Sequence, residues 1–291
     1  MEKPRFIFFG TPQLAVIVLE ELKMKELIPS LIVTAPDKPA GRGLRLTQTP
    51  VKKWAISHGI PTIEPERYDA VAIARLKQEE ADVCVLVAYG TILPKEVLTI
   101  APHGILNVHP SLLPLLRGPS PVRTAILQDQ KVTGVSIIRI DEKMDHGPLL
   151  AQEKYVSDVW PPDAQKLDEF LFSRGGALLA DILPRYLSGA IKPTEQDHSK
   201  ATYSSLFKKE DGLIDLTDDA YQNLLKIHAY AGWPGTYFFT DLPAPADKAD
   251  KNVRIKILSA HIENDALILD NVIPEGGHAM KYADFCKAHN K

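Results

Sequence analysis

Short apolar runs alternate with helical patterns through the first two thirds of the chain, and this alternation constrains the fold most strongly. The most apolar run, Asp82–Ala88, is typical of a central strand buried on both faces. Such alternation predicts an α/β fold with a doubly wound, mainly parallel sheet. The other expected strands are Arg5–Phe9, Leu31–Thr34, Gly104–Val108, Val132–Ile140 and Leu149–Tyr155, and the expected helices are Gln13–Met24, Val51–His58 and Asp163–Tyr186.

The pattern of expected strands and helices changes after the long helix, and this change predicts a second domain. Residues 189–207 are polar and read as a linker, so we expect a first domain over residues 1–188 and a second over 208–291. The second domain is expected to be small and rich in β structure. Its elements are a helix at Asp218–Ala229, a turn at Trp233–Gly235 and strands at Thr236–Thr240, Val253–Ala260 and Ala266–Leu269.

Composition and charge exclude several classes of protein. The chain has 291 residues, 45% of them hydrophobic, and a net charge of -3, so no overall positive field attracts nucleic acid. The two cysteines, Cys84 and Cys286, form no close pair, which suits a reducing, cytoplasmic setting. The first apolar run is too short for a signal peptide, and none reaches the ~20 residues that cross a bilayer.

Candidate catalytic groups follow the ends of the expected strands, where ligands bind in such sheets. Asn107 and His109 are two residues apart, so their side chains lie on the same side of an extended segment. An amide and an imidazole can stabilise an oxyanion and move a proton. A carboxylate can orient the imidazole and favour its charged form. From the residues alone, either Asp141 or Asp145 can take that role.

Metal and dinucleotide sites are not expected. His103, His109, His146 and Asp145 lie in one region, but their spacing matches no standard zinc motif. The turn after the first strand, Gly10-Thr11-Pro12, lacks the G-x-G-x-x-G pattern, so a nicotinamide or flavin cofactor is not expected either.

A basic segment, Asp37–Arg45, is expected to form a long loop between the second strand and the next helix. Lys38, Arg42 and Arg45, with Lys52 and Lys53 nearby, give it five basic residues against one acidic residue. Long loops in compact domains tend to be functional. A basic loop beside a catalytic face suits a polyanionic substrate.

Several motifs in one order carry a family resemblance. Asn107–Pro114 with Arg117-Gly118 and the later Met144–Gly147 resemble the active-site segments of the 10-formyltetrahydrofolate-dependent formyltransferases. The other matching segments are Phe9–Pro12, Pro36–Gly43, Val87–Pro94, Thr133–Ser136, Ala201–Tyr203, Lys209–Asp215 and Trp233–Gly235. The Pro36–Gly43 segment and the second-domain motifs resemble the family members that act on methionyl-tRNA.

The resemblance implies a fold, a reaction and a set of site residues. It implies a Rossmann-like catalytic domain, a shortened oligonucleotide-binding-like (OB-like) domain, and formyl transfer from 10-formyltetrahydrofolate to the α-amine of initiator methionyl-tRNA by a monomer, without metal. The implied catalytic residues are Asn107, His109 and Asp145. The implied folate-binding residues are Tyr89, Gly90, Thr91, Ile92, Leu93, Pro94, Ser111, Leu112, Leu113, Pro114, Arg139, Ile140 and Asp141, and the implied tRNA-binding residues are Lys38, Arg42 and Arg45.

Two departures from the family and two alternatives follow. His146 stands where the family has a smaller residue, and residues 208–291 hold ten Lys and Arg against thirteen Asp and Glu, so that domain is no basic platform. Within the reaction class, the alternative is an amino-sugar nucleotide formyltransferase. Outside it, the alternative is a non-catalytic RNA-binding module.

Overall fold

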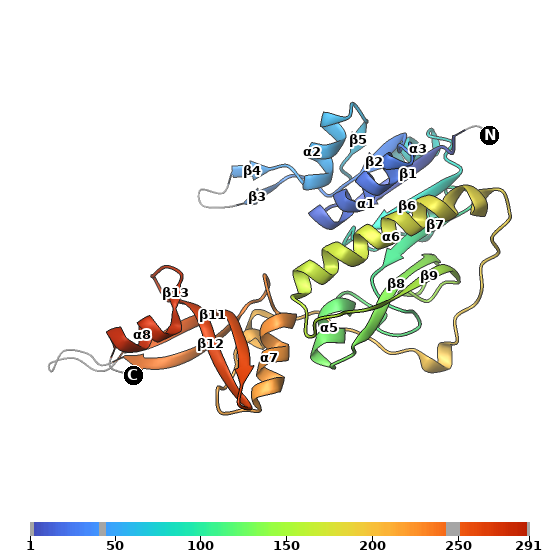
Figure 1. Ribbon diagram of the computed structural model, residues 1–291. Coiled ribbons are helices and arrows are strands. Elements are labelled where there is room, and N and C mark those ends of the chain that lie inside the picture. The colour runs from blue at the N-terminus through green and yellow to red at the C-terminus, as the bar shows by residue number, and fades with distance from the viewer. Residues whose placement is uncertain (1–2, 41–44, 243–250, 290–291) are drawn as a thin grey trace. The chain divides into compact units, whose positions relative to one another are not determined.

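The computed structural model describes residues 3–40, 45–242 and 251–289 and divides the chain into two compact units (Figure 1). The first unit consists of Met1–Gly118, Thr133–Tyr155 and Asp168–Tyr203. The second consists of Pro119–Val132, Val156–Leu167 and Ser204–Lys291. Each unit is therefore assembled from three separate stretches of sequence. No helix among the described residues is long and apolar enough to cross a membrane.

The first unit is built on a seven-stranded sheet in the order β5-β2-β1-β6-β7-β8-β9. The five strands from β5 to β7 are parallel to their neighbours, and β8 runs antiparallel to β7. The strands are β1 (Phe6–Gly10), β2 (Leu31–Val33), β5 (Thr62–Ile63), β6 (Val83–Val87), β7 (Ile105–His109), β8 (Val132–Arg139) and β9 (Leu149–Val156). The expected mainly parallel, doubly wound sheet is confirmed.

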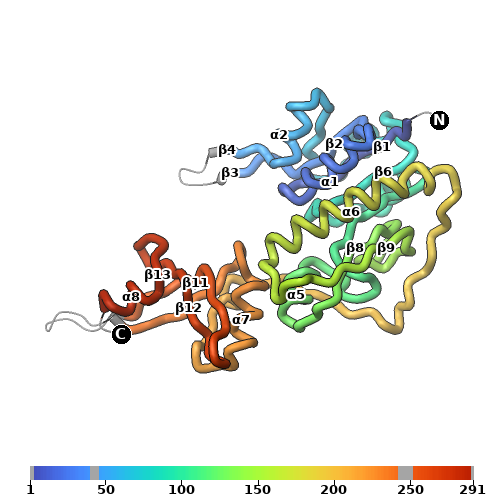
Figure 2. Tube along the Cα trace, viewed as in Figure 1, coloured from blue at the N-terminus to red at the C-terminus, as the bar shows by residue number. Residues whose placement is uncertain are grey.

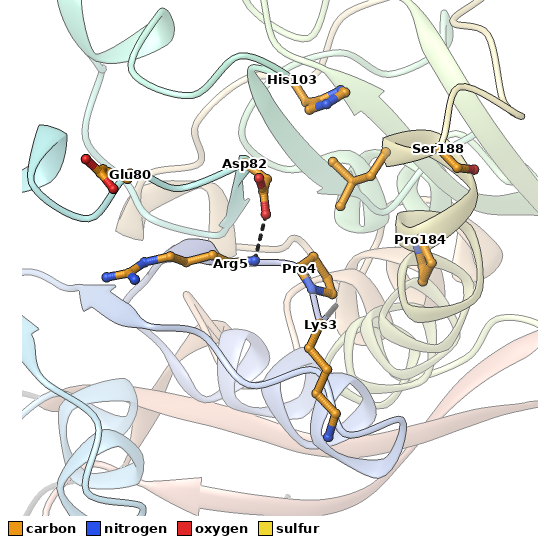
Figure 3. Close-up of a pocket in the computed structure, with 9 residues that line it drawn as sticks. Lys3, Pro4, Arg5, Glu80, Asp82, His103, Pro184 and Ser188 are labelled. Atoms are coloured by element: carbon orange, nitrogen blue, oxygen red, sulfur yellow. Dashed lines mark hydrogen bonds between the residues drawn. The ribbon is translucent and has the colours of Figure 1, made fainter. Parts of the chain in front are cut away.

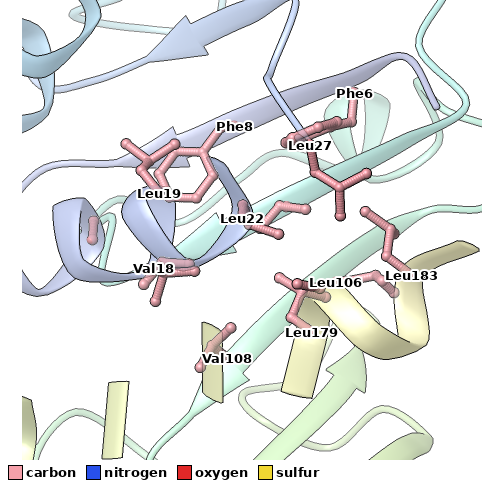
Figure 4. Close-up of a cluster of buried hydrophobic side chains, with 14 of the residues drawn as sticks. Phe6, Phe8, Val18, Leu19, Leu22, Leu27, Leu106, Val108, Leu179 and Leu183 are labelled. Atoms are coloured by element: carbon pink, nitrogen blue, oxygen red, sulfur yellow. The ribbon is translucent and has the colours of Figure 1, made fainter. Parts of the chain in front are cut away.

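One face of this sheet is covered by α1 (Gln13–Met24) and by α6 (Ala164–Leu187) from Asp168 onward (Figure 4). Alternate residues of the strands point to this face, so Phe6 and Phe8 of β1 meet helix residues such as Leu22. Both phenylalanines are fully buried, and each contributes about 1.5–3 kcal/mol relative to an exposed side chain. A smaller cluster on the other face includes Ile105 and residues of α3 (Ala70–Lys77) and α4 (Lys95–Leu98).

The chain after α6 continues as an extended segment along the first unit (Figure 2). Leu149 at the start of β9 and Thr194 exchange two backbone hydrogen bonds of 2.8 Å each. Further along, Arg117 donates its backbone N–H to the Thr202 carbonyl at 2.9 Å. Most of the stretch expected to be a linker, up to Tyr203, thus belongs to the first unit and is hydrogen-bonded to it at two places.

The second unit contains an antiparallel sheet in the order β10-β11-β12-β13. Its strands are β10 (Thr236–Leu242), β11 (Lys251–Glu263), β12 (Ala266–Pro274) and β13 (Met280–Lys281), with α5 (Pro121–Leu127), α7 (Ala220–Ala229) and α8 (Tyr282–Ala288) as its helices. Ile227, Ile255 and Phe285 form part of its apolar core. The expected β-rich domain is confirmed as an antiparallel sheet.

The basic segment differs from the expected long loop. Lys38–Ala40 and Arg45–Thr47 form the strands β3 and β4 of an antiparallel pair, followed by α2 (Pro50–Ser57). Short hairpin strands carry little hydrophobic periodicity, which explains why the sequence pattern missed them. Residues 41–44, including Arg42, lie outside the described residues.

Candidate active site

Asn107, His109 and Asp145 meet at the carboxyl end of β7. Asn107 and His109 are two residues apart on this strand and so share one of its faces, and Asp145 lies in the turn between β8 and β9. The Asn107 amide donates to Asp145 Oδ1 at 3.4 Å, and His109 Nδ1 lies 3.6 Å from Asp145 Oδ2. His109 is itself within β7 and pairs with Ser136 of β8, whereas the sequence pattern placed it just beyond the strand.

The hydrogen bonds of His109 determine where its protons lie. Nε2 is 3.1 Å from the Leu116 carbonyl, which can only accept, so Nε2 carries a proton. In the neutral ring, Nδ1 would then present a lone pair to the Asp145 carboxylate. A second proton on Nδ1 turns this repulsion into an ion pair. Because the two side chains are only 5% and 15% exposed, that ion pair is weakly screened by water.

Asp145 is held in an uncommon backbone conformation. Its φ is +48°, a region that residues other than glycine rarely adopt. The Gly118 backbone N–H donates to its Oδ2 at 2.7 Å. Two residues later, a side chain at Gly147 would collide with the Arg139 carbonyl, so only glycine fits there. The turn therefore fixes the direction in which the carboxylate points.

Asp141, the other carboxylate considered from the sequence, faces a different imidazole. Its Oδ2 accepts from His146 Nδ1 at 2.6 Å. The His146 ring in turn stacks on that of His198, with 3.9 Å between centroids and 7° between planes. Asp145, and not Asp141, is thus the carboxylate beside His109.

A cavity of about 440 Å³ opens beside this cluster in the first unit. Its lining includes both Asn107 and Asp145. It also includes five of the predicted folate-binding residues, namely Thr91, Ile92, Leu93, Ile140 and Asp141. The rest of the lining is formed by Leu86, Lys95, Leu98, Glu142, Lys143 and Met144. The apolar contribution of Leu86 and Leu98 suits a flat heterocycle.

The other eight predicted folate-binding residues lie outside the lining of this cavity. Tyr89 is 4% exposed, packs edge-on against Phe9 and accepts a 2.8 Å hydrogen bond from Tyr68. Ser111 is 1% exposed, and its hydroxyl donates to the Leu115 carbonyl at 2.6 Å. The remaining residues of this kind outside the described lining are Gly90, Pro94, Leu112, Leu113, Pro114 and Arg139.

Sequence reasoning did not single out Leu86, Lys95 or Leu98. Leu86 lies on β6 in register with Asn107 of β7, and Lys95 and Leu98 lie on α4. The position of Leu86 opposite Asn107 could have identified it as a lining residue, but only if the pairing of β6 with β7 had been known. Lys95 also pairs with Glu142 at 2.6 Å across the lining, and this hydrogen bond raises the pKa of Lys95.

Of the predicted tRNA-binding residues, the structure describes Lys38 and the backbone of Arg45. Lys38 is exposed at the start of β3, and Arg45 begins β4, where its side chain is not among those described. Lys52, counted among the nearby basic residues, is instead bonded to Asp37 at 2.8 Å and to Glu64 at 2.9 Å. These hydrogen bonds raise its pKa. Lys52 therefore belongs to a cluster of net negative charge and is not a spare cation.

A second cavity, of about 490 Å³, lies at the amino-terminal edge of β1 and β6 (Figure 3). Asp82 there accepts the Arg5 backbone N–H at 2.8 Å, as the dashed line shows. None of the predicted catalytic residues lines this cavity. Among the described residues, no three His, Cys, Asp or Glu side chains gather in a way that could hold a metal ion.

Comparisons with known proteins identify the family of this chain. The family described as formyl transferase matches residues 4–166, and the formyl transferase C-terminal domain matches residues 206–266. Methionyl-tRNA formyltransferase of Chloroflexus aggregans is 47% identical over 238 residues, covering 81% of this chain and 76% of that protein. The enzyme of that name from Thermus thermophilus is 37% identical over 300 residues, covering 98% and 96%.

A solved structure shares the fold. HypX from Aquifex aeolicus, in complex with tetrahydrofolic acid, aligns with a TM-score of 0.65 at 15% identity, covering 100% of this chain and 48% of that one. From the matched domains and from relatives aligned over 76% and 96% of their length, we conclude that this chain is an enzyme of the methionyl-tRNA formyltransferase family.

Proposed function

We propose that this enzyme transfers a formyl group from 10-formyltetrahydrofolate to the α-amine of methionine on initiator tRNA. One observation carries the proposal most directly. The Asn107 amide and the His109 imidazole each approach the Asp145 carboxylate, at 3.4 Å and 3.6 Å, beside a cavity with an apolar wall. The relatives are named for formyl transfer to methionyl-tRNA, which supports this acceptor, and the cavity suits the donor.

The reaction forms and breaks one bond at the formyl carbon. The α-amine attacks that carbon, and the carbonyl oxygen becomes an oxyanion. The intermediate then expels N10 of the folate, so the amine loses one proton and N10 gains one. An enzyme accelerates this sequence by stabilising the oxyanion and by moving the proton, and loss of one oxyanion donor typically costs about 10²–10³ in rate.

Asn107 supplies the most accessible donor for the oxyanion. One of its two amide hydrogens points toward Asp145 at 3.4 Å, and the side chain contributes to the cavity lining. The other hydrogen can be donated to substrate. His109 lies behind it with its Nε2 proton bonded to Leu116, so His109 reaches the oxyanion only by exchanging that bond.

Asp145 combines two tasks in this proposal. It places a negative charge 3.6 Å from His109 Nδ1, and its position in the cavity lining lets it take the proton released by the attacking amine, directly or through water. The 3.6 Å separation from His109 Nδ1 exceeds an ordinary hydrogen bond. Catalytic contacts often tighten when substrate binds, and we expect this one to shorten.

The donor is proposed to lie with its pteridine between the 91–93 segment and the 140–144 segment. Leu86, Leu93, Leu98 and Ile140 provide apolar contact there. Lys143 in the lining is suited to the anionic tail of the folate, whereas Lys95 already pairs with Glu142. Lys38, Arg42 and Arg45 of the basic segment are proposed to contact tRNA phosphates.

The test is a formyl-transfer assay with purified protein and 10-formyltetrahydrofolate. Charged initiator tRNA, charged elongator tRNA and an amino-sugar nucleotide are offered separately as acceptors. We expect formylated methionyl-tRNA from the initiator species. Product only with the sugar nucleotide would reassign the acceptor. Binding of RNA without folate binding or any formyl product would indicate a non-catalytic RNA-binding module.

A further inference from the structure

Gln196 is a buried polar residue in the extended segment after α6, which sequence reasoning treated as linker. It is 4% exposed and lies 51 residues beyond Asp145 in the chain. Buried amides are found where every polar atom has a partner, because an unpaired one costs about 1–3 kcal/mol. The partners of Gln196 therefore indicate why an amide is kept there.

The amide nitrogen of Gln196 holds both ends of the catalytic turn. Nε2 donates to the Asp145 carbonyl at 2.9 Å and to the Gly147 carbonyl at 2.7 Å. Those two donations use both of its hydrogens. They fall on either side of His146, within the turn in which Asp145 has a φ of +48°. A rarely adopted backbone conformation persists only where its surroundings impose it.

The amide oxygen of Gln196 is fixed by Arg117. Oε1 accepts from Arg117 Nε at 3.2 Å and from Nη2 at 2.7 Å. A guanidinium can only donate, so the oxygen must face Arg117 and the nitrogen must face the turn. Arg117 is 2% exposed, and its Nη2 also donates to His198 Nδ1 at 2.8 Å. The orientation of the Gln196 amide is thus determined by its neighbours.

Arg117 also belongs to the segment that contacts the catalytic side chains directly. The Leu116 carbonyl accepts from His109, and the Gly118 N–H donates to the Asp145 carboxylate. Arg117, between them, extends its side chain to Gln196. Asp145 is consequently held by two sets of hydrogen bonds. The 116–118 segment bonds its carboxylate, Gln196 bonds its backbone carbonyl, and Arg117 connects the two.

We propose that Gln196 is a positioning residue for formyl transfer, which sets the direction of the Asp145 carboxylate, and that Arg117 in turn orients Gln196. Gln196 is not in the described lining of the catalytic cavity, so it acts through Asp145 and not on substrate. The inference rests on the proposed function, because it takes Asp145 to be catalytic.

The test compares Gln196→Met with the wild type and repeats the comparison in an Asp145→Ala background. Methionine keeps the length of the side chain but donates no hydrogen bond. Small displacements of a catalytic group have large effects, so we expect kcat to fall on the order of 10–100-fold with KM for the folate donor within about threefold. In the Asp145→Ala background the same change should lower the rate less than about threefold, because two residues acting as a unit are not additive.

Gln152→Met provides a matched control. Gln152 on β9 also makes two 2.8 Å donations, to the Leu113 carbonyl and to Ser136 Oγ, and neither bond involves the 145–147 turn. Its effect on kcat, whatever its size, should be the same factor in both backgrounds. If Gln196→Met also lowered the rate equally in both, or left kcat at the wild-type value, the positioning role would be overturned.

Gln196→Glu keeps the test decisive if the methionine variant does not fold. The carboxylate retains a partner for buried Arg117 but offers no hydrogen to the Asp145 and Gly147 carbonyls, so the same loss of kcat is expected. A folded Gln196→Glu variant with normal kcat would refute the inference. Failure of the proposed function is recognised separately, because the wild type would then form no formylated methionyl-tRNA. If Asp145 were not catalytic, Asp145→Ala alone would keep the wild-type rate.

Discussion

Replacing Asp145 with asparagine removes one negative charge while keeping the size of the side chain. The carboxylate accepts from both Gly118 and Asn107. An amide in either orientation places its own N–H groups against one of these donors. The variant also leaves His109 without the charge that lies 3.6 Å from Nδ1. Asp145→Asn therefore removes the charge beside His109 and one of the two accepted hydrogen bonds, while the volume of the side chain is kept.

The magnitude follows from the geometry of this pair. Two unit charges about 4 Å apart interact by about 4 kcal/mol at an effective dielectric constant of about 20. At about 1.4 kcal/mol for each factor of ten, the full interaction corresponds to about 10³ in rate. Because both side chains are largely buried, water cannot replace the lost charge, and most of this interaction energy should be missing in the variant. We therefore expect kcat to fall by about 10²–10³.

The assay is single-turnover formyl transfer at saturating folate donor, with circular dichroism to confirm the fold. Asp181→Asn is the control. Asp181 pairs with Lys25 at 3.3 Å, but its side chain is 63% exposed, and pairs in water contribute little. Its kcat should match the wild type. A folded Asp145→Asn variant within about threefold of the wild-type kcat would refute the assigned role of the charge.

Four further outcomes are expected. Burial lowers the pKa of His228 from its ordinary 6.5, with nearby Asp163 opposing this in part. The unfolded chain then binds more protons, so the free energy of unfolding should fall as the pH drops below about 6.5, and His228→Gln should flatten that dependence in urea titrations. Burial raises the pKa of the Cys84 thiol to about 12, so alkylation at about pH 8 should modify Cys84 only after unfolding, as peptide mass spectrometry would show. Lys38→Ala should raise KM for charged tRNA and reduce the slope of log affinity against log salt by about one, and an unchanged slope would remove Lys38 from the tRNA site. Dialysis against EDTA should leave activity unchanged, and a loss restored by zinc would show that a metal site was overlooked.

The sheet could be predicted because its signals are local. Gln13–Met24 was expected as a helix and has those bounds as α1, since its apolar residues recur at helical spacing. Asp82–Ala88 was expected as a central strand, and β6 lies between β1 and β7. Short elements such as the β3–β4 hairpin and α5 escaped, because three to seven residues are too few to display a period.

Only those site residues that belong to a short sequence motif could be predicted. Asn107 and His109 are two residues apart in the sequence, so their common face could be argued from the period of a strand. The choice between Asp141 and Asp145 depended on the family resemblance, because both lie in the same turn. Gln196 and Lys52 could not be interpreted beforehand, since their partners are distant in sequence and become apparent only in three dimensions.

The interleaving of the two units limits how this enzyme can be divided or recombined. The family matches divide the chain into consecutive parts, yet the second unit also contains residues 119–132 and 156–167. Within that unit, Asp129 accepts hydrogen bonds from both Trp160 and Tyr221, and α5 packs on α7. A fragment ending near residue 203 would thus expose the apolar side of α5. A chimaera designed to change the acceptor would therefore need to exchange all three stretches together.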